Sequence, residues 1–278
     1  MAAKSHAEHQ HDIDALAAHR DGSGGTFWAS PDGRWGVGNL FSTLDCGLIL
    51  HELGVANSDP IMAGIAGLVL ACQTEDGRIR PGPHLAVQPC HTASGARLLC
   101  RLGYARDKRL SLTFEHLLAT QAPDGGWRCS VLKYGAGPDT DFSNPGVTLG
   151  VLDAMRFRKT LLTESAVERA VETLLSHWRI ERPLGPCRFG IGSRFMRVEY
   201  PFLRYNLFNY VFVLSFYPRA RASKPFAEAL AALEAQLRDG EIVVAHTKSG
   251  LKMLEFCREG APSPLATRRY REILRNLG

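Results

Sequence analysis

The chain has 278 residues, of which 45% are hydrophobic and 22% are charged, and its formal net charge is +5. This composition is close to the globular average and excludes a chain that is mainly disordered or fibrous. No apolar run is long enough to span a bilayer, residues 1–20 contain no apolar signal segment, and the mild basic charge comes with no nucleic-acid-binding module. We therefore expect a cytoplasmic protein without a transmembrane segment or a nucleic-acid partner.

Helical periodicity recurs along the whole chain, because apolar residues return at spacings of three and four and no window alternates like a strand. In chain order, the spacing predicts helices over residues 11–20, 40–53, 61–73, 90–102, 109–121, 146–157, 164–178, 202–216, 223–237, 247–257 and 265–276. These helices alternate between the first and the second helix of a hairpin, and the series begins and ends with a first helix. We expect residues 1–10 to be flexible and residues 11–278 to form a single domain.

A repeat of about fifty residues underlies the alternation. Its markers are the turns Asp32-Gly33, Asp76-Gly77, Asp124-Gly125 and Asp239-Gly240, with Pro183–Pro186 near the middle of the last, double gap. Hairpins that repeat in this way bury a core that they share with their neighbours. Such hairpins form either an open solenoid or a closed ring. Five or six of them suit a closed, all-α ring, in which the second helices form an inner barrel inside the first helices.

A second repeat joins two distant parts of the chain. The sequence His91-Thr92-Ala93-Ser94-Gly95 returns as His246-Thr247-Lys248-Ser249-Gly250, about three repeats later. Both copies are expected to open a second helix. In a ring of hairpins they would face each other across the centre.

Two stretches resemble a known superfamily. Gln121–Trp127, with the sequence QAPDGGW, resembles the Q-x-x-D-G-G-W turn of the terpenoid cyclases and protein prenyltransferases, and Gln73–Gly77 is similar to a worn copy of it. Cys90–Tyr104 is similar to an inner helix of these proteins. The resemblance covers residues 10–276 and implies a single α/α toroid that acts on an isoprenoid-like molecule. A fold hosts many functions, so the reaction has to be argued from the site.

The chain departs from both mechanisms of the superfamily. Asp139-Thr140-Asp141-Phe142 lacks the last acid of the D-x-D-D motif of class II terpene cyclases. Asp45-Cys46 lacks the residue that separates Asp from Cys in the zinc motif of the prenyltransferases. Six first helices and five second helices also leave a gap in the ring. The N-terminal segment, a second copy in a homodimer or a partner subunit could complete it.

We expect the loops before the second helices to converge at one end of the ring. Their residues allow three alternative kinds of chemistry. Asp45, Cys46, Cys90 and His91 offer the ligand types of a zinc site, although residues at helix starts would have the same pattern. Asp139 and Asp141 repel each other, so one of them could be protonated and act as an acid, with His91 and His246 as further acid–base candidates. Alternatively, Cys90 beside His91 could be a reactive thiol. No Cys-x-x-Cys pair occurs, so the seven cysteines predict neither a disulfide framework nor a zinc ribbon.

An arginine-rich loop precedes a stretch rich in Phe and Tyr, at residues 195–217. Guanidiniums bind diphosphates or carboxylates, and aromatic rings line apolar cavities. Solvated loop charges and a core-filling helix are the alternatives. The candidate substrate-binding residues are Arg188, Arg194, Arg197, Arg204, Tyr205, Phe208, Phe212 and Trp127.

Three functions remain open from the sequence. The first is an enzyme that acts on a hydrophobic, isoprenoid-like small molecule in the central cavity by acid–base or metal-assisted chemistry. The second is a non-catalytic toroid that binds a lipid or a protein partner. The third is a zinc-dependent enzyme that activates thiols.

Overall fold

The computed structural model describes residues 8–20, 28–30, 32–36, 41–129 and 137–278, and over these residues the chain forms helices and isolated bridges but no β-strand. The prediction of an all-α protein is thereby confirmed for the described part. Most of the segment that we predict to be flexible, residues 1–10, lies outside it.

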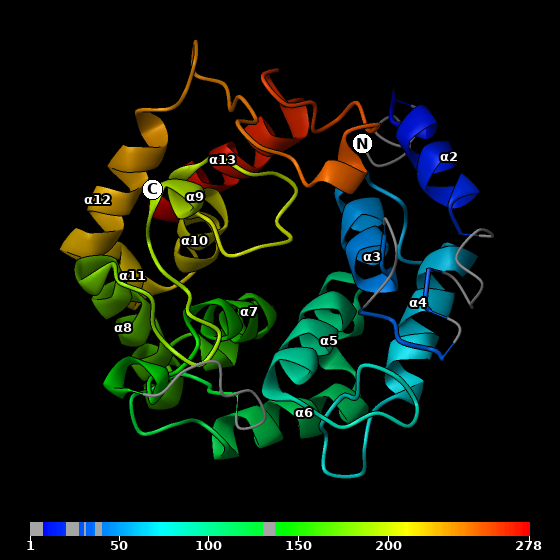
Figure 1. The fold of residues 1–278 in the computed structure, drawn as a ribbon, viewed down its shortest axis with the longest axis horizontal. Coiled ribbons are helices and arrows are strands. Elements are labelled where there is room, and N and C mark those ends of the chain that lie inside the picture. The colour runs from blue at the N-terminus through cyan, green and yellow to red at the C-terminus, as the bar shows by residue number, and fades with distance from the viewer. Residues whose placement is uncertain (1–7, 21–27, 31, 37–40, 130–136) are drawn as a thin grey trace.

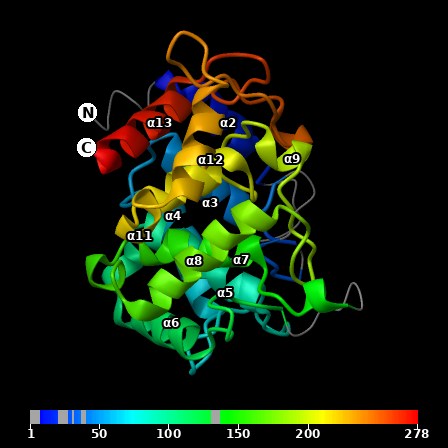
Figure 2. The same cartoon turned by 90° about the vertical axis from the view of Figure 1, so that its left-hand side faces the viewer.

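The long helices alternate between two layers. The first helices of the pairs are α2 (Gln10–Ala18), α4 (Pro60–Ala71), α6 (Lys108–Ala119), α8 (Ser165–Ile180) and α12 (Lys224–Glu234). The second helices are α3 (Thr43–Glu52), α5 (Pro89–Arg101), α7 (Pro145–Met155), α10 (Leu207–Leu214) and α13 (Pro264–Leu277). Figure 1 shows α3, α5, α7 and α10 nearer to the middle of the molecule than α4, α6, α8 and α12. In Figure 2, turned by 90°, α8 and α12 cross the face nearest the viewer.

Helix starts are encoded locally. Ser42 Oγ caps α3 by accepting a hydrogen bond from Asp45 N at 3.1 Å, and Asp59 Oδ1 caps α4 by accepting from Ile61 N at 2.9 Å. Helices α5, α7 and α13 begin with proline, whose fixed φ suits the first turn and whose missing N–H costs nothing there. These signals place the predicted starts of α3, α4, α5 and α7 within three residues of the observed ones.

The Asp-Gly turns dock on the next first helix. Gly77 and Gly125 have φ values of +84° and +88°, and a Cβ there would lie 2.4 Å and 2.8 Å from backbone atoms of α6 and α8. Gln73 Nε2 donates to the Arg109 carbonyl at 2.8 Å, and Gln121 Nε2 donates to a carbonyl of α8 at 2.6 Å. Only glycine fits such a close, left-handed turn, which explains why both turns carry glycine at this position.

One hydrogen bond recurs after three of the turns. The backbone N–H two residues beyond the turn glycine donates to a threonine hydroxyl in the following second helix. The pairs are Ile79 with Thr92 at 3.2 Å, Trp127 with Thr148 at 3.3 Å, and Ile242 with Thr267 at 3.0 Å. Because Thr267 belongs to α13, this helix is the second helix of its pair.

The predicted helix over residues 247–257 is wrong. This segment contains only a 3₁₀ turn, Ser249–Leu251, and its backbone is held by tertiary contacts instead. The Asp12 carboxylate of α2 accepts hydrogen bonds from Glu255 N at 2.7 Å and Phe256 N at 3.0 Å. The second copy of the His-Thr-x-Ser-Gly motif therefore does not open a helix.

The expectation of an unpaired first helix is also wrong. Residues 265–276 form most of α13, which is a second helix, so the described residues contain five complete pairs. Arg269 Nε of α13 lies 2.8 Å from Glu52 Oε2 of α3, and Arg268 donates to the Glu52 carbonyl at 3.2 Å. The last pair thus contacts the first, and a partner subunit or second copy stays a prediction.

The sequence predicts no transmembrane segment, and the lengths and hydropathy of the helices address this prediction. In the described ranges, no helix is both long enough and apolar enough to cross a bilayer.

Candidate functional site

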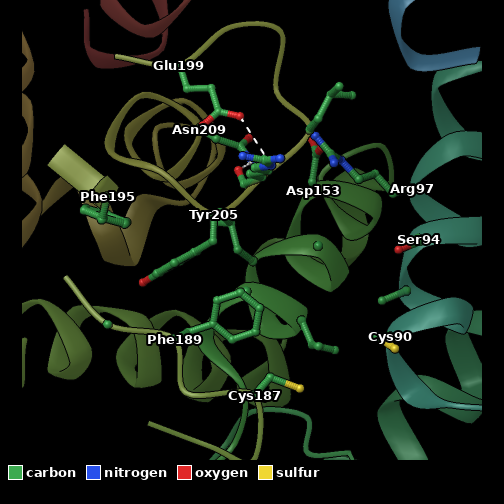
Figure 3. A pocket seen from close by; sticks show the side chains of 18 of the residues that line it. Cys90, Ser94, Arg97, Asp153, Cys187, Phe189, Phe195, Glu199, Tyr205 and Asn209 are labelled. Carbon is green, nitrogen blue, oxygen red and sulfur yellow. Dashed lines mark hydrogen bonds and ion pairs between the residues drawn. The ribbon is translucent and has the colours of Figure 1, made fainter. Parts of the chain in front are cut away.

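A pocket with a volume of about 580 Å³ lies between α5, α7, the start of α10 and the loop that precedes α10 (Figure 3). Helix α5 lines it with Cys90, Ser94 and Arg97, and α7 lines it with Gly146 and Asp153 among others. These positions are three, four or seven residues apart, so each helix presents one face to the pocket. The volume falls within the range of about 300–1,000 Å³ that small-molecule sites usually have.

Three aromatic rings from the loop form one wall of the pocket. The centroid of Tyr205 lies 4.9 Å from that of Phe195 and 5.7 Å from that of Phe189. Tyr205 Oη is held by His177 Nδ1 at 2.8 Å. A Cβ on Gly146 would lie 2.6 Å from the Phe189 ring, so the glycine lets this ring lie against α7. The wall is apolar and fixed by packing and hydrogen bonding.

The charged lining is mainly cationic. Its guanidiniums and carboxylates come from Arg97, Arg188, Arg194, Arg204, Asp153 and Glu199. Arg188 and Arg194 are exposed, and their guanidiniums make no ion pair with any residue in the described part of the chain. Unpaired guanidiniums beside an apolar wall favour a ligand with an anionic head and an apolar tail.

Glu199 is a buried carboxylate of the pocket, with 4% of its surface exposed. Its Oε1 lies 3.7 Å from Arg204 Nε. Burial raises the pKa of the Glu199 carboxyl, while Arg204, His246 and Arg194 oppose the shift. A carboxyl that faces a cavity and whose pKa is raised by burial is a candidate for giving or taking a proton.

Asp153 belongs to a buried ionic network below the pocket. Its carboxylate accepts hydrogen bonds from Arg97, from Arg101 at 2.8 Å and from Arg156 at 2.6 Å. Burial alone would raise the pKa of the Asp153 carboxyl, but the three guanidiniums outweigh burial and hold it well below its usual range. Asp153 therefore stays ionised and acts as an anchor for the arginines.

Glu52 of α3 extends this network of buried charges to α13, near the C-terminus. The Glu52 carboxylate accepts from Arg101 at 3.0 Å, Arg269 at 2.8 Å and Tyr200 Oη at 2.6 Å. The pKa of Glu52 is lowered because Arg269 and Arg101 outweigh the effect of burial. Helices α3, α5, α7 and α13 thus share one set of buried charges.

The surroundings of Cys90 argue against a reactive thiol at this position. Cys90 and Cys187 line the pocket, but burial, together with Cys129 and Cys187 nearby, raises the pKa of the Cys90 thiol to about 11. The thiol is therefore protonated at neutral pH and a poor nucleophile. None of the seven cysteines, all of which lie in the described ranges, forms a disulfide.

The proposed zinc ligands do not converge. Asp45 Oδ2 pairs with Lys248 Nζ at 2.7 Å, Cys46 is fully buried with a raised pKa, and His91 is absent from the pocket lining that includes Cys90. Within the described ranges, no group of three or more His, Cys, Asp or Glu is placed to hold a metal ion. The structure does not bring these four residues together around one point, and the zinc site stays a prediction.

The predicted acids lie outside the pocket. Asp139 pairs with Arg182 at 3.3 Å, and Asp141, whose side chain is 85% exposed, lies 3.8 Å from Arg128. Neither is in the apolar cavity that a protonated acid requires. His246 Nδ1 lies 3.1 Å from Glu259 Oε1, and His246 is not part of the pocket lining.

The substrate-binding predictions divide into two groups. Arg188, Arg194, Arg204 and Tyr205 line the pocket. The others do not: Phe208 and Phe212 are fully buried in the core, Arg197 is exposed outside the lining, and Trp127 Nε1 donates to the Leu117 carbonyl at 2.8 Å.

The sequence reasoning missed Arg97, Asp153, Glu199 and Asn209, which all line the pocket. A signal for the first two was present, because each is a charged residue within an apolar second helix. Such a residue is rarely buried without a partner. Glu199 and Asn209 carried no comparable signal.

No protein-family model matches the chain, and no curated protein is significantly similar to it. The likeness to terpenoid cyclases and protein prenyltransferases thus rests on the turn and helix motifs.

Proposed function

We propose that the chain is an α/α toroid of five helical hairpins, related to the terpenoid cyclases and protein prenyltransferases. The alternation of first and second helices along the chain supports this fold. The threonine hydrogen bond that recurs after three turns supports a common origin for the pairs. The ion pair between Arg269 and Glu52 supports ring closure, because it joins the last pair to the first.

We propose further that the central pocket binds a small amphiphilic molecule with an anionic head and an isoprenoid-like apolar tail. The observation that carries this proposal is the pair of unpaired guanidiniums, Arg188 and Arg194, at a pocket walled by Phe189, Phe195 and Tyr205. Guanidiniums bind phosphate oxygens through paired hydrogen bonds, and the rings bury an apolar chain.

The direct test is calorimetric titration with farnesyl diphosphate. The Arg188→Ala/Arg194→Ala variant should bind at least about tenfold more weakly than the wild type, because charge-assisted hydrogen bonds to the head are lost. The matched control is Arg271→Ala/Arg275→Ala, which removes two exposed arginines of α13 and should bind normally. Equal binding by both variants would contradict the proposal.

We propose that the bound molecule is also altered chemically, with Glu199 as the group that moves a proton. Glu199 is the carboxyl of the pocket that is not held by several guanidiniums, and its pKa is raised by burial. The alternative is binding without chemistry, which the position of Asp139 and Asp141 outside the pocket favours. Mass spectrometry of farnesyl diphosphate after incubation separates the two, because an enzyme forms a product that is lost in Glu199→Gln.

A further inference from the structure

Asn209, at the start of α10, leaves one polar atom without a partner. Asn209 lines the pocket and is only 4% exposed. Its Oδ1 is buried and accepts no hydrogen bond from any described residue. Its Nδ2 donates to the Arg204 carbonyl at 2.9 Å, and its backbone N–H donates to Asn206 Oδ1 at 2.9 Å. The amide orientation is therefore fixed, with the oxygen as the atom that lacks a donor.

The carboxylate of Glu199 is a second acceptor without a donor. It makes no hydrogen bond within the described ranges, and its nearest cation is Arg204 Nε at 3.7 Å. Arg204 joins the two acceptors, since its side chain faces Glu199 and its carbonyl binds Asn209. Figure 3 shows both side chains at the end of the pocket opposite Cys187 and Phe189.

A buried acceptor such as Asn209 Oδ1 needs a donor, and the Glu199 carboxylate, which lines the same pocket, has room for one. Leaving one unpaired costs as much as losing a hydrogen bond, so native structures pair nearly all of them. A ligand can supply a donor from a neutral group such as a hydroxyl or from a charged ammonium. The Glu199 carboxylate would attract an ammonium, but the lining also holds the guanidiniums of Arg97, Arg188, Arg194 and Arg204, which repel it. A hydroxyl carries no charge, so it can meet both acceptors without this repulsion.

We infer that the pocket selects anionic amphiphiles whose head also carries two neighbouring hydroxyls, as in glycerol- or sugar-like groups, with one hydroxyl donating to Glu199 and the other to Asn209 Oδ1. The anionic group lies toward Arg188 and Arg194, and the tail lies along the aromatic wall. This inference rests on the proposed function and narrows its substrate class.

The test compares dodecyl glyceryl phosphate with dodecyl propyl phosphate, which have the same charge and tail and differ in two hydroxyls. Calorimetric titration of the wild type should show about tenfold or tighter binding of the glyceryl compound. Asn209→Leu and Glu199→Met remove one acceptor each and should lower this preference, whereas Glu199→Gln keeps an acceptor oxygen and should retain most of it. Thermal unfolding of each variant establishes that it is folded. If Asn209→Leu does not fold, Glu199→Met and Glu199→Gln test the inference on their own.

The outcomes separate this inference from the proposed function. Equal binding of the two compounds by the wild type, with both weakened by Arg188→Ala/Arg194→Ala, overturns the hydroxyl inference and leaves the anionic pocket standing. A preference that persists in both Asn209→Leu and Glu199→Met overturns the assignment of the acceptors. Binding of neither compound, or binding that ignores the arginine variant, overturns the pocket and the inference together.

Discussion

Asp153 shows how one buried carboxylate fixes several arginines. Its partners Arg97, Arg101 and Arg156 are brought together from α5 and the end of α7, and the Asp153 side chain is only 1% exposed. Removing the negative charge leaves three buried guanidiniums without their shared partner, which is far more costly than losing an exposed pair.

Asp153→Asn should therefore lower the free energy of unfolding by about 3–5 kcal/mol. Urea unfolding followed by circular dichroism measures the change. Asp139→Asn is the matched control, and it should change stability by less than about 0.5 kcal/mol because its ion pair with Arg182 is half exposed. Similar effects of the two changes would show that the network does not anchor the arginines.

Glu199 should make stability depend on pH. Because its folded pKa is raised, the favourable contribution is complete below the unfolded pKa of about 4.3 and is lost as the pH rises through the folded pKa. Gln does not ionise, so the melting temperature of Glu199→Gln should rise relative to that of the wild type as the pH increases above about 4.3. A difference in melting temperature that does not change with pH would mean that burial does not raise the pKa of the Glu199 carboxyl.

At the residue scale, the sequence predicted the kind of side chain in the pocket better than the individual positions. On α5, Cys90, Ser94 and Arg97 share the pocket face, whereas His91 lies about 100° away from Cys90 around the helix. His91, which the sequence suggested, thus falls outside the pocket because of helical register. Phe208 and Phe212 were misplaced for the same reason, since they face the core.

At the element scale, helix positions followed from apolar periodicity, proline and capping residues. The exceptions have tertiary causes. The Asp12 carboxylate holds the backbone near Glu255, so residues 247–257 do not form a helix. Helix α10 begins five residues later than predicted, at Leu207, because the preceding residues line the pocket. Neither contact is visible in local sequence.

The threonine bonds offer a test of the pairing of α12 with α13. Thr267→Val removes the acceptor for Ile242 N–H, which is buried, and should destabilise the protein by about 1–3 kcal/mol. Thr163→Val, at an exposed position, is the control and should be nearly neutral. Chemical denaturation measures both. A neutral Thr267→Val would remove α13 from the series of equivalent second helices.

At the scale of the whole molecule, contacts between the two ends of the chain should make unfolding cooperative. Glu52 binds Arg269, and Asp12 binds the backbone at Glu255 and Phe256, so the last pair cannot leave without exposing the first. Far-ultraviolet circular dichroism and tryptophan fluorescence should therefore report one coincident urea transition. Two separated transitions would contradict both ring closure and the predicted single domain.

The whole-molecule arrangement was only partly predictable. The repeat marked the hairpins, because a left-handed Asp-Gly turn needs the same residues each time. The pocket arose from the convergence of α5, α7 and the loop that carries Phe189 and Phe195, and such convergence depends on packing between distant segments. The resemblance to a superfamily indicated a central cavity but placed the acids, Asp139 and Asp141, in it wrongly.

The central claim is that an anionic amphiphile binds in this pocket with its head at the arginines. The most direct measurement is a crystal structure of the protein with farnesyl diphosphate. We predict density for the diphosphate at Arg188 and Arg194 and for the chain along Phe195 and Tyr205. An ordered ligand at another site, with the pocket filled only by water, would contradict the account.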